Sequence, residues 1–445
     1  MQHSFSQGQV VIWITLILGG GSWAQEETAP AVLTLGEAVA YALEHSPRLQ
    51  ASAKEVHAAQ AKLEQTRAQQ RVGLNFQAVE TRLGPSISFP LGTRIVTVVP
   101  DSRREFALSL NKVFYAGGAL RASRRLAELG VEAAQGQYLQ TAQEVVYGAV
   151  RAYLEVLKAQ ALRAVAAEAV NLAQEQLRLA TVNFEAGTVA KFDVFSARTA
   201  LANAQQGLLR AENAVELARA GFNLALGRRP TEPMELAPLE REEAEIPGLE
   251  ESLQLAYAQR PELQILQYNL AMARQSVQLV AAGRRPTIAL NANYTRQTAT
   301  AFAESYSYNA SLVVSFPLFD GGQVRASLRE ARANLARVED LRRQTEQAIE
   351  LEVKQALLNL EEARQRILTA QEEVTQAEEG LRVANLRYEA GVSPIIEVQN
   401  ARLALTQARA NLVTATYDRA RAEAEWRKAT GTYAAQLQEK LGLAR

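Results

Sequence analysis

The chain has 445 residues, and its 48 lysines and arginines balance its 48 aspartates and glutamates, so the formal net charge is zero. A neutral chain lacks the basic excess that binds nucleic acid, so no nucleic-acid partner is expected. Cysteine is absent, which excludes disulfides, thiolate metal sites, cysteine nucleophiles and a lipid anchor on an N-terminal cysteine.

Residues 1–24 have the pattern of a secretory signal peptide. Residues 10–18 are apolar but too few to cross a bilayer, and Ala24 closes a stretch of small residues that suits cleavage. The segment before this apolar core has no lysine or arginine, so a non-cleaved anchor is the alternative. No later segment has the roughly 20 apolar residues of a transmembrane helix, so any further membrane entry must use β-strands.

The remainder contains one structural unit twice, at residues 33–227 and 251–433. Three motifs recur in the same order: HSPRLQ at 45–50 and QRPELQ at 259–264, FYAGGALRAS at 114–123 and LFDGGQVRAS at 318–327, and NFEAG at 183–187 and RYEAG at 387–391. The members of the first pair lie 214 positions apart and those of the later pairs 204. The first unit therefore holds an insertion, which we place in a loop around residues 84–101.

Each unit begins with a helix and continues with two predicted strands. The strands cover residues 71–82 and 104–113 in the first unit and 286–296 and 305–316 in the second. Side chains alternate between an apolar, aromatic-rich face and a mostly polar face, as in Tyr306, Tyr308, Ala310, Leu312 and Val314 against their neighbours. Strands of about ten residues with this pattern are typical of outer-membrane barrels. A soluble sheet packed on a core is the alternative.

Two long helices are predicted to follow the strands of each unit. No proline occurs between Gly118 and Glu185, and apolar residues recur at heptad-like spacing, at Val146, Val150, Tyr153 and Leu157. A helix of this length would extend roughly 100 Å. Gly187 and Gly391 end the long helices, because glycine adopts the left-handed conformation of a helix C-cap at little cost. Two helical hairpins with tips near residues 187 and 391 follow.

Three smaller features remain. Residues 228–250 are rich in proline and acidic residues and form either a linker or a belt around the helices, and residues 434–445 form a C-terminal tail.

Glycine pairs mark both strand–helix junctions, at Gly117, Gly118, Gly321 and Gly322. No phosphate-binding motif follows them, so backbone freedom explains them better. The histidines after residue 24 are His45 and His57, which offer no familiar zinc or nucleophile–base site, so we expect no enzyme, cofactor or metal.

The requirements of a lipid bilayer indicate how the strands and helices are assembled. Four strands cannot span a bilayer alone, because open sheet edges are not tolerated in hydrocarbon and closed barrels begin at about eight strands. The chain must therefore oligomerise, and two copies would supply eight strands and three copies twelve. The helices would project to one side as a hollow tube, so that barrel and tube together form a duct.

Two copies of P-x-L-Q, GG-x-x-RAS and [FY]-E-A-G around paired strands resemble the TolC-like outer membrane efflux protein family, from about Leu33 to Tyr433. The resemblance implies a homotrimer with a 12-stranded outer-membrane β-barrel, four strands per protomer, continued by a periplasmic α-helical coiled-coil barrel. It also implies a passive exit duct in a Gram-negative-type outer membrane, serving a tripartite efflux or type I secretion system. Its partners would be a periplasmic adaptor and an inner-membrane transporter. A periplasmic coiled-coil protein that never enters the membrane is the alternative, and the substrate is not readable.

The resemblance also implies functional positions at the tips. In the family the tip glycines dock against the adaptor, and here they are Gly187 and Gly391, followed by Thr188 and Val392. A latch tyrosine matches Tyr388, whereas the latch arginine is replaced by Ser393, with Arg387 as a substitute candidate.

The family's acidic pair is half retained, as Glu397 and Asn400, and Asp193 holds the first of these positions in the first unit. Three copies of Glu397 around an axis would favour cations. Alternatively, Asp193 and Glu397 only stabilise the first turns of helices. The gate candidates are therefore Asp193, Arg387, Tyr388 and Glu397. We expect the second hairpin to move and the first to be the fixed frame.

Overall fold

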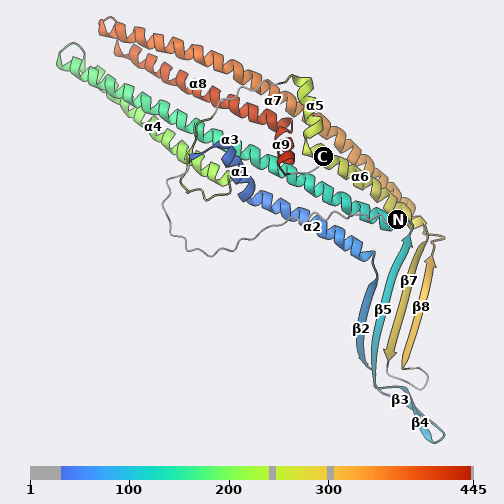
Figure 1. Ribbon diagram of the computed structural model, residues 1–445. Coiled ribbons are helices and arrows are strands. Elements are labelled where there is room, and N and C mark those ends of the chain that lie inside the picture. Colours follow the sequence, from blue (N-terminus) through green and yellow to red (C-terminus); the bar gives the residue numbers. More distant parts are fainter. Residues whose placement is uncertain (1–31, 240–246, 298–304, 442–445) are drawn as a thin grey trace, which may run out of the picture.

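The computed structural model describes residues 32–239, 247–297 and 305–441. The predicted signal peptide, residues 1–24, lies outside these ranges. Long helices lie side by side in an elongated bundle, and an antiparallel sheet extends from one end of it (Figure 1). None of the described helices is both long and apolar enough to cross a membrane.

Both halves of the chain fold through the same series of elements. The first half comprises α1 (Leu35–His45), α2 (Pro47–Gln69), β2 (Gly73–Arg82), β5 (Ser102–Ala116), α3 (Ala119–Glu185) and α4 (Lys191–Ala225). The second half comprises α5 (Leu249–Gln259), α6 (Pro261–Ala281), the 3-10 turn η1 (Ala282–Arg284), β7 (Thr287–Gln297), β8 (Tyr306–Ser315), α7 (Gln323–Glu389) and α8 (Ile395–Ala429). The helices α3 and α7 each have 67 residues, and α4 and α8 each have 35.

The insertion in the first half forms a β-hairpin rather than the loop that we predicted around residues 84–101. Its strands are β3 (Ile87–Leu91) and β4 (Arg94–Val99), and they pair antiparallel. Gly92 has a φ of 63°, which suits the two-residue turn between them. The position of the insertion was predicted correctly, but Gly92 was not recognised as the turn residue of a hairpin. The hairpin extends beyond the sheet at the end away from the helices (Figure 1).

The main sheet has the order β2-β5-β7-β8, with every neighbouring pair antiparallel. Its register places the apolar side chains of all four strands on one face, for example in the row Phe76, Leu108, Tyr294 and Tyr308. The adjacent row on the other face is polar and consists of Asn75, Ser109, Asn293 and Asn309. No described helix covers either face (Figure 1), so a sheet packed on a core within the chain is excluded for this part of the protein.

The first recurring motif of each half meets a glycine that follows the last long helix of the same half. His45 ends α1, and its carbonyl oxygen lies 2.8 Å from where a Cβ on Gly227 would be. In the second half, the carbonyl oxygen of Gln259 lies 3.0 Å from the corresponding position on Gly431. Both glycines also have positive φ, 79° and 77°. Each unit is thus closed by a glycine that follows its last long helix and touches its first helix.

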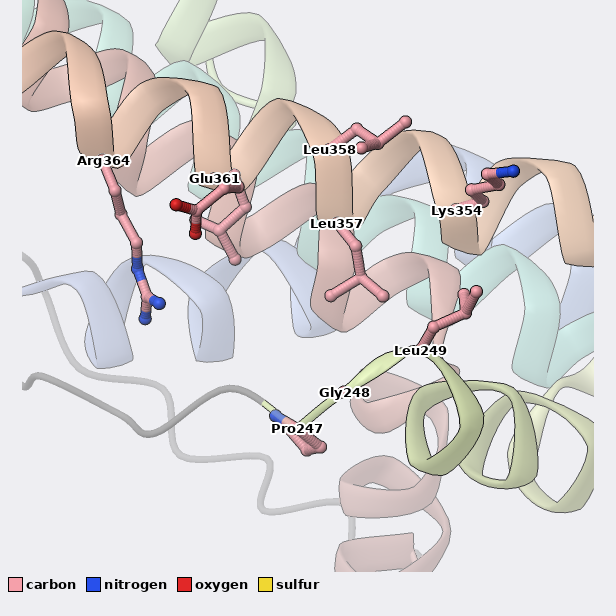
Figure 2. Close-up of a pocket in the computed structure, with 9 residues that line it drawn as sticks. Pro247, Gly248, Leu249, Lys354, Leu357, Leu358, Glu361 and Arg364 are labelled. Carbon is pink, nitrogen blue, oxygen red and sulfur yellow. The ribbon is translucent and has the colours of Figure 1, made fainter.

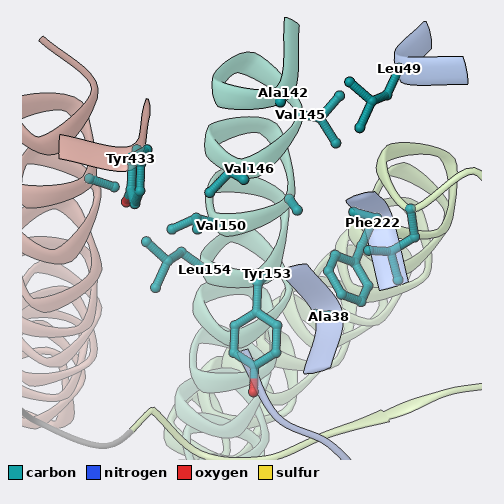
Figure 3. Packing of buried hydrophobic residues seen from close by; sticks show 14 of the residues in the cluster. Ala38, Leu49, Ala142, Val145, Val146, Val150, Tyr153, Leu154, Phe222 and Tyr433 are labelled. Atoms are coloured by element: carbon teal, nitrogen blue, oxygen red, sulfur yellow. The ribbon is translucent and has the colours of Figure 1, made fainter. Parts of the chain in front are cut away.

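The main core lies along the middle of α3. All four predicted heptad residues are buried, and Tyr153 is only 1% exposed. Its ring packs edge-on against Phe222 at 5.8 Å, beside Ala38 of α1 (Figure 3). The Tyr153 hydroxyl donates to the Ala237 carbonyl at 2.6 Å and lies 3.2 Å from the carbonyl of Leu33.

This hydroxyl holds two chain segments against the bundle. The two-residue strands β1 (Val32–Leu33) and β6 (Glu235–Leu236) pair in parallel beside it, and Met234 is buried. The described part of the connector therefore packs on the helices, as the belt alternative requires. The predicted tail is helical up to Leu441, because α9 (Thr432–Leu441) buries Ala434 and Leu437 in the same core, and residues 442–445 lie outside the described ranges. An apolar stripe at helical spacing is the signal for this helix.

We predict that Gly227→Ala destabilises the protein more than Gly187→Ala. Both glycines have positive φ, which costs about 1–2 kcal/mol for a residue with a Cβ, but only at Gly227 would the Cβ also clash, with the His45 carbonyl. Thermal unfolding followed by circular dichroism measures the difference. Equal midpoints for the two variants would contradict the close approach at Gly227.

Candidate functional site

The two hairpin tips lie together at the end of the bundle farthest from the sheet (Figure 1). Gly187 and Gly391 have φ values of 74° and 71°. The next amide in each turn bonds back five residues, from Thr188 to the Asn183 carbonyl at 2.9 Å and from Val392 to the Arg387 carbonyl at 3.0 Å. This bond closes a Schellman motif, which requires the left-handed residue that glycine supplies. Neither glycine position has a described atom within 4 Å of an added Cβ, so both turns present open backbone.

Contacts between the hairpins begin directly behind these turns. Tyr388, in the last turn of α7, donates its hydroxyl to Asp193 Oδ2 at 3.3 Å. One turn further on, Gln399 Nε2 donates to Ser196 Oγ at 2.9 Å. A small apolar cluster of Ala180, Ala197 and Ile395 lies beneath these polar contacts. The two hairpins are therefore joined at the tip by an apolar contact with hydrogen bonds above it.

The environment of Tyr388 keeps its hydroxyl protonated. Burial, and then the negative charge of Asp193, raise the pKa of Tyr388 to about 12. A raised pKa means that the stabilising contact is complete below the ordinary tyrosine pKa near 10 and is lost only as the pH rises through about 12. At physiological pH the hydroxyl therefore remains a donor to Asp193.

The other two gate candidates form a pair within the second hairpin. Arg387 Nη1 lies 3.3 Å from Glu397 Oε2, and both side chains are about half exposed. Arg387 thus contacts Glu397 rather than Asp193, and the hydroxyl bond to Asp193 comes from Tyr388. Asp193 and Glu397 both lie in the first turn of their helices, α4 and α8, where a carboxylate also complements the helix dipole.

The sequence analysis missed the contacts that join distant segments at this end. Arg402 Nη1 donates to the Leu172 carbonyl, and Ser196 meets Gln399, across separations of 230 and 203 residues. No local pattern marks such pairs, because each partner alone is an ordinary polar residue on a helix. Ser393, the position of the expected latch arginine, is buried.

The glycine pairs at the strand–helix junctions differ in their surroundings. All four glycines have positive φ. An added Cβ on Gly117 would lie 2.5 Å from the Ala282 carbonyl oxygen, and Arg285 Nη1 donates to the Gly117 carbonyl at 3.0 Å. The corresponding Gly321 has no described atom within 4 Å of an added Cβ. The same junction is therefore covered in the first half of the chain and open in the second.

Figure 2 shows an open groove of about 330 Å³ between α7 and the segment that leads into α5. Its floor includes Leu357, Leu249 and Pro247, and its charged rim includes Lys354 and Arg364. Among the described residues, no three histidines, aspartates or glutamates gather as metal ligands would.

Known proteins resemble this chain over most of its length. Residues 38–228 and 252–432 match the sequence profile of the family described as "Outer membrane efflux protein". Protein CyaE of Bordetella pertussis is 30% identical over 344 residues, which is 75% of this chain and 70% of CyaE. The outer membrane channel CmeC of Campylobacter jejuni superposes with a TM-score of 0.79 at 17% identity, over 98% of this chain and 97% of CmeC. The outer membrane protein VceC of Vibrio cholerae gives 0.75 at 19% identity, over 89% and 96%.

We predict that Tyr388→Phe loosens the tip without unfolding the bundle, because it removes the donor to Asp193 and keeps the partly buried ring. Backbone amides of residues 187–193 and 391–397 should exchange with deuterium faster than in the unmodified protein. Tyr308→Phe, on the exposed face of β8, is the matched control and should leave these rates unchanged. Identical exchange at the tip in Tyr388→Phe would show that the hydrogen bond does not hold the hairpins together.

Proposed function

Because this chain belongs to the outer membrane efflux protein family, we propose that three copies of it build the exit duct and receive substrate from a periplasmic adaptor and an inner-membrane transporter. At the level of the family, the protein is an outer-membrane exit duct of an efflux or secretion system, with a helical extension in the periplasm. The number of copies and the partners are the proposal.

The sheet is the observation that carries it. Its edge strands β2 and β8 each have a neighbour on one side only in the described chain, and one face of the sheet carries mostly apolar side chains that are exposed or half-exposed. An unpaired backbone group in hydrocarbon costs several kcal/mol, so a membrane sheet must close into a barrel. Three copies would close a barrel of twelve strands, with the apolar faces toward lipid and the asparagine-rich faces toward a wet lumen.

The hairpin tips fit the periplasmic entrance of such a duct. Gly187, Thr188, Gly391 and Val392 form the adaptor contact in this proposal, since their turns offer backbone and small surfaces to a partner. The bond from Tyr388 to Asp193 holds the entrance shut, and the pair of Arg387 with Glu397 lies beside it within the second hairpin. The second hairpin moves as the gate and the first is the frame. Specificity then belongs to the transporter, whether the cargo is a drug, a metal ion or a protein.

The duct predicts where the protein is found and how it migrates. After cell fractionation, we expect it in the detergent-extracted outer-membrane fraction, as a species three times the mass of the chain that falls to a single chain on boiling. The closed barrel accounts for this heat-modifiable migration, because its strands unpair only on heating. Recovery in the soluble periplasmic fraction would favour the alternative, a coiled-coil protein that does not enter the membrane.

The ion selectivity of the duct tests whether Glu397 sets the charge of the entrance. Glu397→Ala should lower cation preference in planar-bilayer reversal potentials, because it removes three carboxylates and leaves three Arg387 guanidinium groups unpaired. Glu397→Asp keeps the charge and should keep the preference. An unchanged reversal potential in Glu397→Ala would assign Glu397 to the helix dipole alone.

A further inference from the structure

One edge of the chain lacks the neighbours that its counterpart has. In the first half, α3 and β5 lie against α6, α8 and β7 of the second half. In the second half, α7 and β8 hold the corresponding places, but their far side is uncovered in the described chain. Leu318 and Phe319, at the junction between them, are 92% and 90% exposed.

We infer that this uncovered edge binds α2, α4 and β2 of a second copy of the chain, through the same residue contacts that join the two halves. The inference rests on the proposed homotrimer and specifies the seam between its copies. It follows from a numerical rule. A residue of β5, α3 or α4 corresponds to the one 204 positions later, and a residue of α2 or β2 corresponds to the one 214 positions later. Equal helix lengths keep this correspondence free of gaps.

A buried glutamine gives the first contact. Gln143 of α3 is 1% exposed, and its Nε2 donates to the Lys428 carbonyl of α8 at 3.1 Å. The corresponding residue of α7 is also a glutamine, Gln347, and it is exposed. The acceptor corresponding to Lys428 is Leu224 of α4, which is 70% exposed. Gln347 therefore donates to the Leu224 carbonyl of the neighbouring copy.

An arginine gives the second contact, nearer the tips. Arg402 of α8 donates to the Leu172 carbonyl of α3. The corresponding residue of α4 is again an arginine, Arg198, which is exposed. Its acceptor by the same rule is the Gln376 carbonyl of α7 in the neighbouring copy. The two donors, Arg402 and Arg198, are the same residue type, because the side chain makes the contact. The two acceptors, Leu172 and Gln376, differ in type, because only the backbone carbonyl is needed.

The strand–helix junction gives the third contact. Gly117 is covered by Ala282 and by Arg285, which donates to its carbonyl. The corresponding residues are Ala68 and Arg71, and the corresponding glycine is the open Gly321. Alanine, arginine and glycine are all repeated. Arg71 of one copy therefore donates to Gly321 of the next and covers it.

The sheet register extends across the same seam. Leu110 of β5 lies opposite Ala292 of β7, and Tyr115 lies opposite Ile288. By the rule, Val314 then lies opposite Ala78 of the next copy, and Phe319 opposite Leu74. Each predicted pair joins apolar residues on the same face, as an odd shift in register would not. This pairing would cover Phe319.

The helices supply a pair that is suited to a test. Gly136 of α3 lies so close to α6 that an added Cβ would be 2.8 Å from Ile265 Cγ1 and 4.0 Å from Ile265 Cβ. The corresponding pair is Asp340 of α7 and Ala51 of α2. The larger residue of this pair therefore lies on the long helix, whereas in the pair of Gly136 with Ile265 the long helix carries the smaller residue. A Cβ–Cβ distance of 4.0 Å lies within the range of about 3.5–4.5 Å that a disulfide spans.

The experiment is disulfide cross-linking in a chain that has no cysteine of its own. Ala51→Cys/Asp340→Cys is purified in detergent, oxidised with copper phenanthroline and run on a non-reducing denaturing gel. We expect a covalent ring at three times the chain mass that returns to one chain on reduction. Gly136→Cys/Ile265→Cys is the matched control, and its disulfide should form within one chain and leave the mass unchanged. A mixture of the two single variants, Ala51→Cys and Asp340→Cys, should give linked pairs only.

The outcomes separate the seam from the trimer. If the control pair closes and native mass spectrometry finds three copies, but Ala51→Cys/Asp340→Cys retains its free thiols, then the seam is wrong and the homotrimer stands. If the unmodified protein is a single chain by native mass spectrometry, then the homotrimer itself fails, and the seam with it.

Discussion

The pairing of backbone hydrogen bonds at the sheet edges is the constraint on which the rest of this protein depends. A four-stranded sheet with one apolar face leaves the outer sides of β2 and β8 unpaired. Water could satisfy those groups, but hydrocarbon cannot. In the proposed trimer the sheet closes with other copies, and closure fixes how the helices must leave it. Both long helical hairpins begin at glycine turns that follow β5 and β8, so they leave the sheet at the same end and would continue the proposed ring as a tube.

The duplication of the chain lets one set of contacts serve two kinds of junction. Within the chain, the junction between the halves is covered, as at Gly117 and Gln143. Its counterpart in the second half has the same residue types at the positions whose side chains act, but they are exposed. Where two side chains only fill space, the residues differ, as in Gly136 with Ile265 and Asp340 with Ala51. Polar donors need a fixed position, whereas packing needs only a fixed total volume.

The tips are built from weaker contacts than the core beneath them. Tyr153 is fully enclosed and holds two chain segments through its hydroxyl. At the tips, Arg387 and Glu397 are half exposed, and an exposed ion pair contributes only about 0–1 kcal/mol. The bond from Tyr388 to Asp193 lies over a small apolar cluster rather than in a core. Contacts of this strength would let the tips open locally without disturbing the bundle, as the proposed gate requires.

The sequence by itself determined the strands of the main sheet, the long helices and their order, whereas the single helix predicted at the start of each unit is two helices, α1 with α2 and α5 with α6. Period-two alternation, heptad spacing and the recurring glycines each act over a few residues, so they specify the strands, the long helices and both tips without knowledge of the fold. Local signals that were present but overlooked explain the hairpin around Gly92 and the helix α9. Only the tertiary structure decided which hairpin residues meet. Tyr388 contacts Asp193 while the adjacent Arg387 turns to Glu397, because neighbouring residues on a helix point in different directions. Their partners depend on how the helices twist around one another, and no local pattern encodes that.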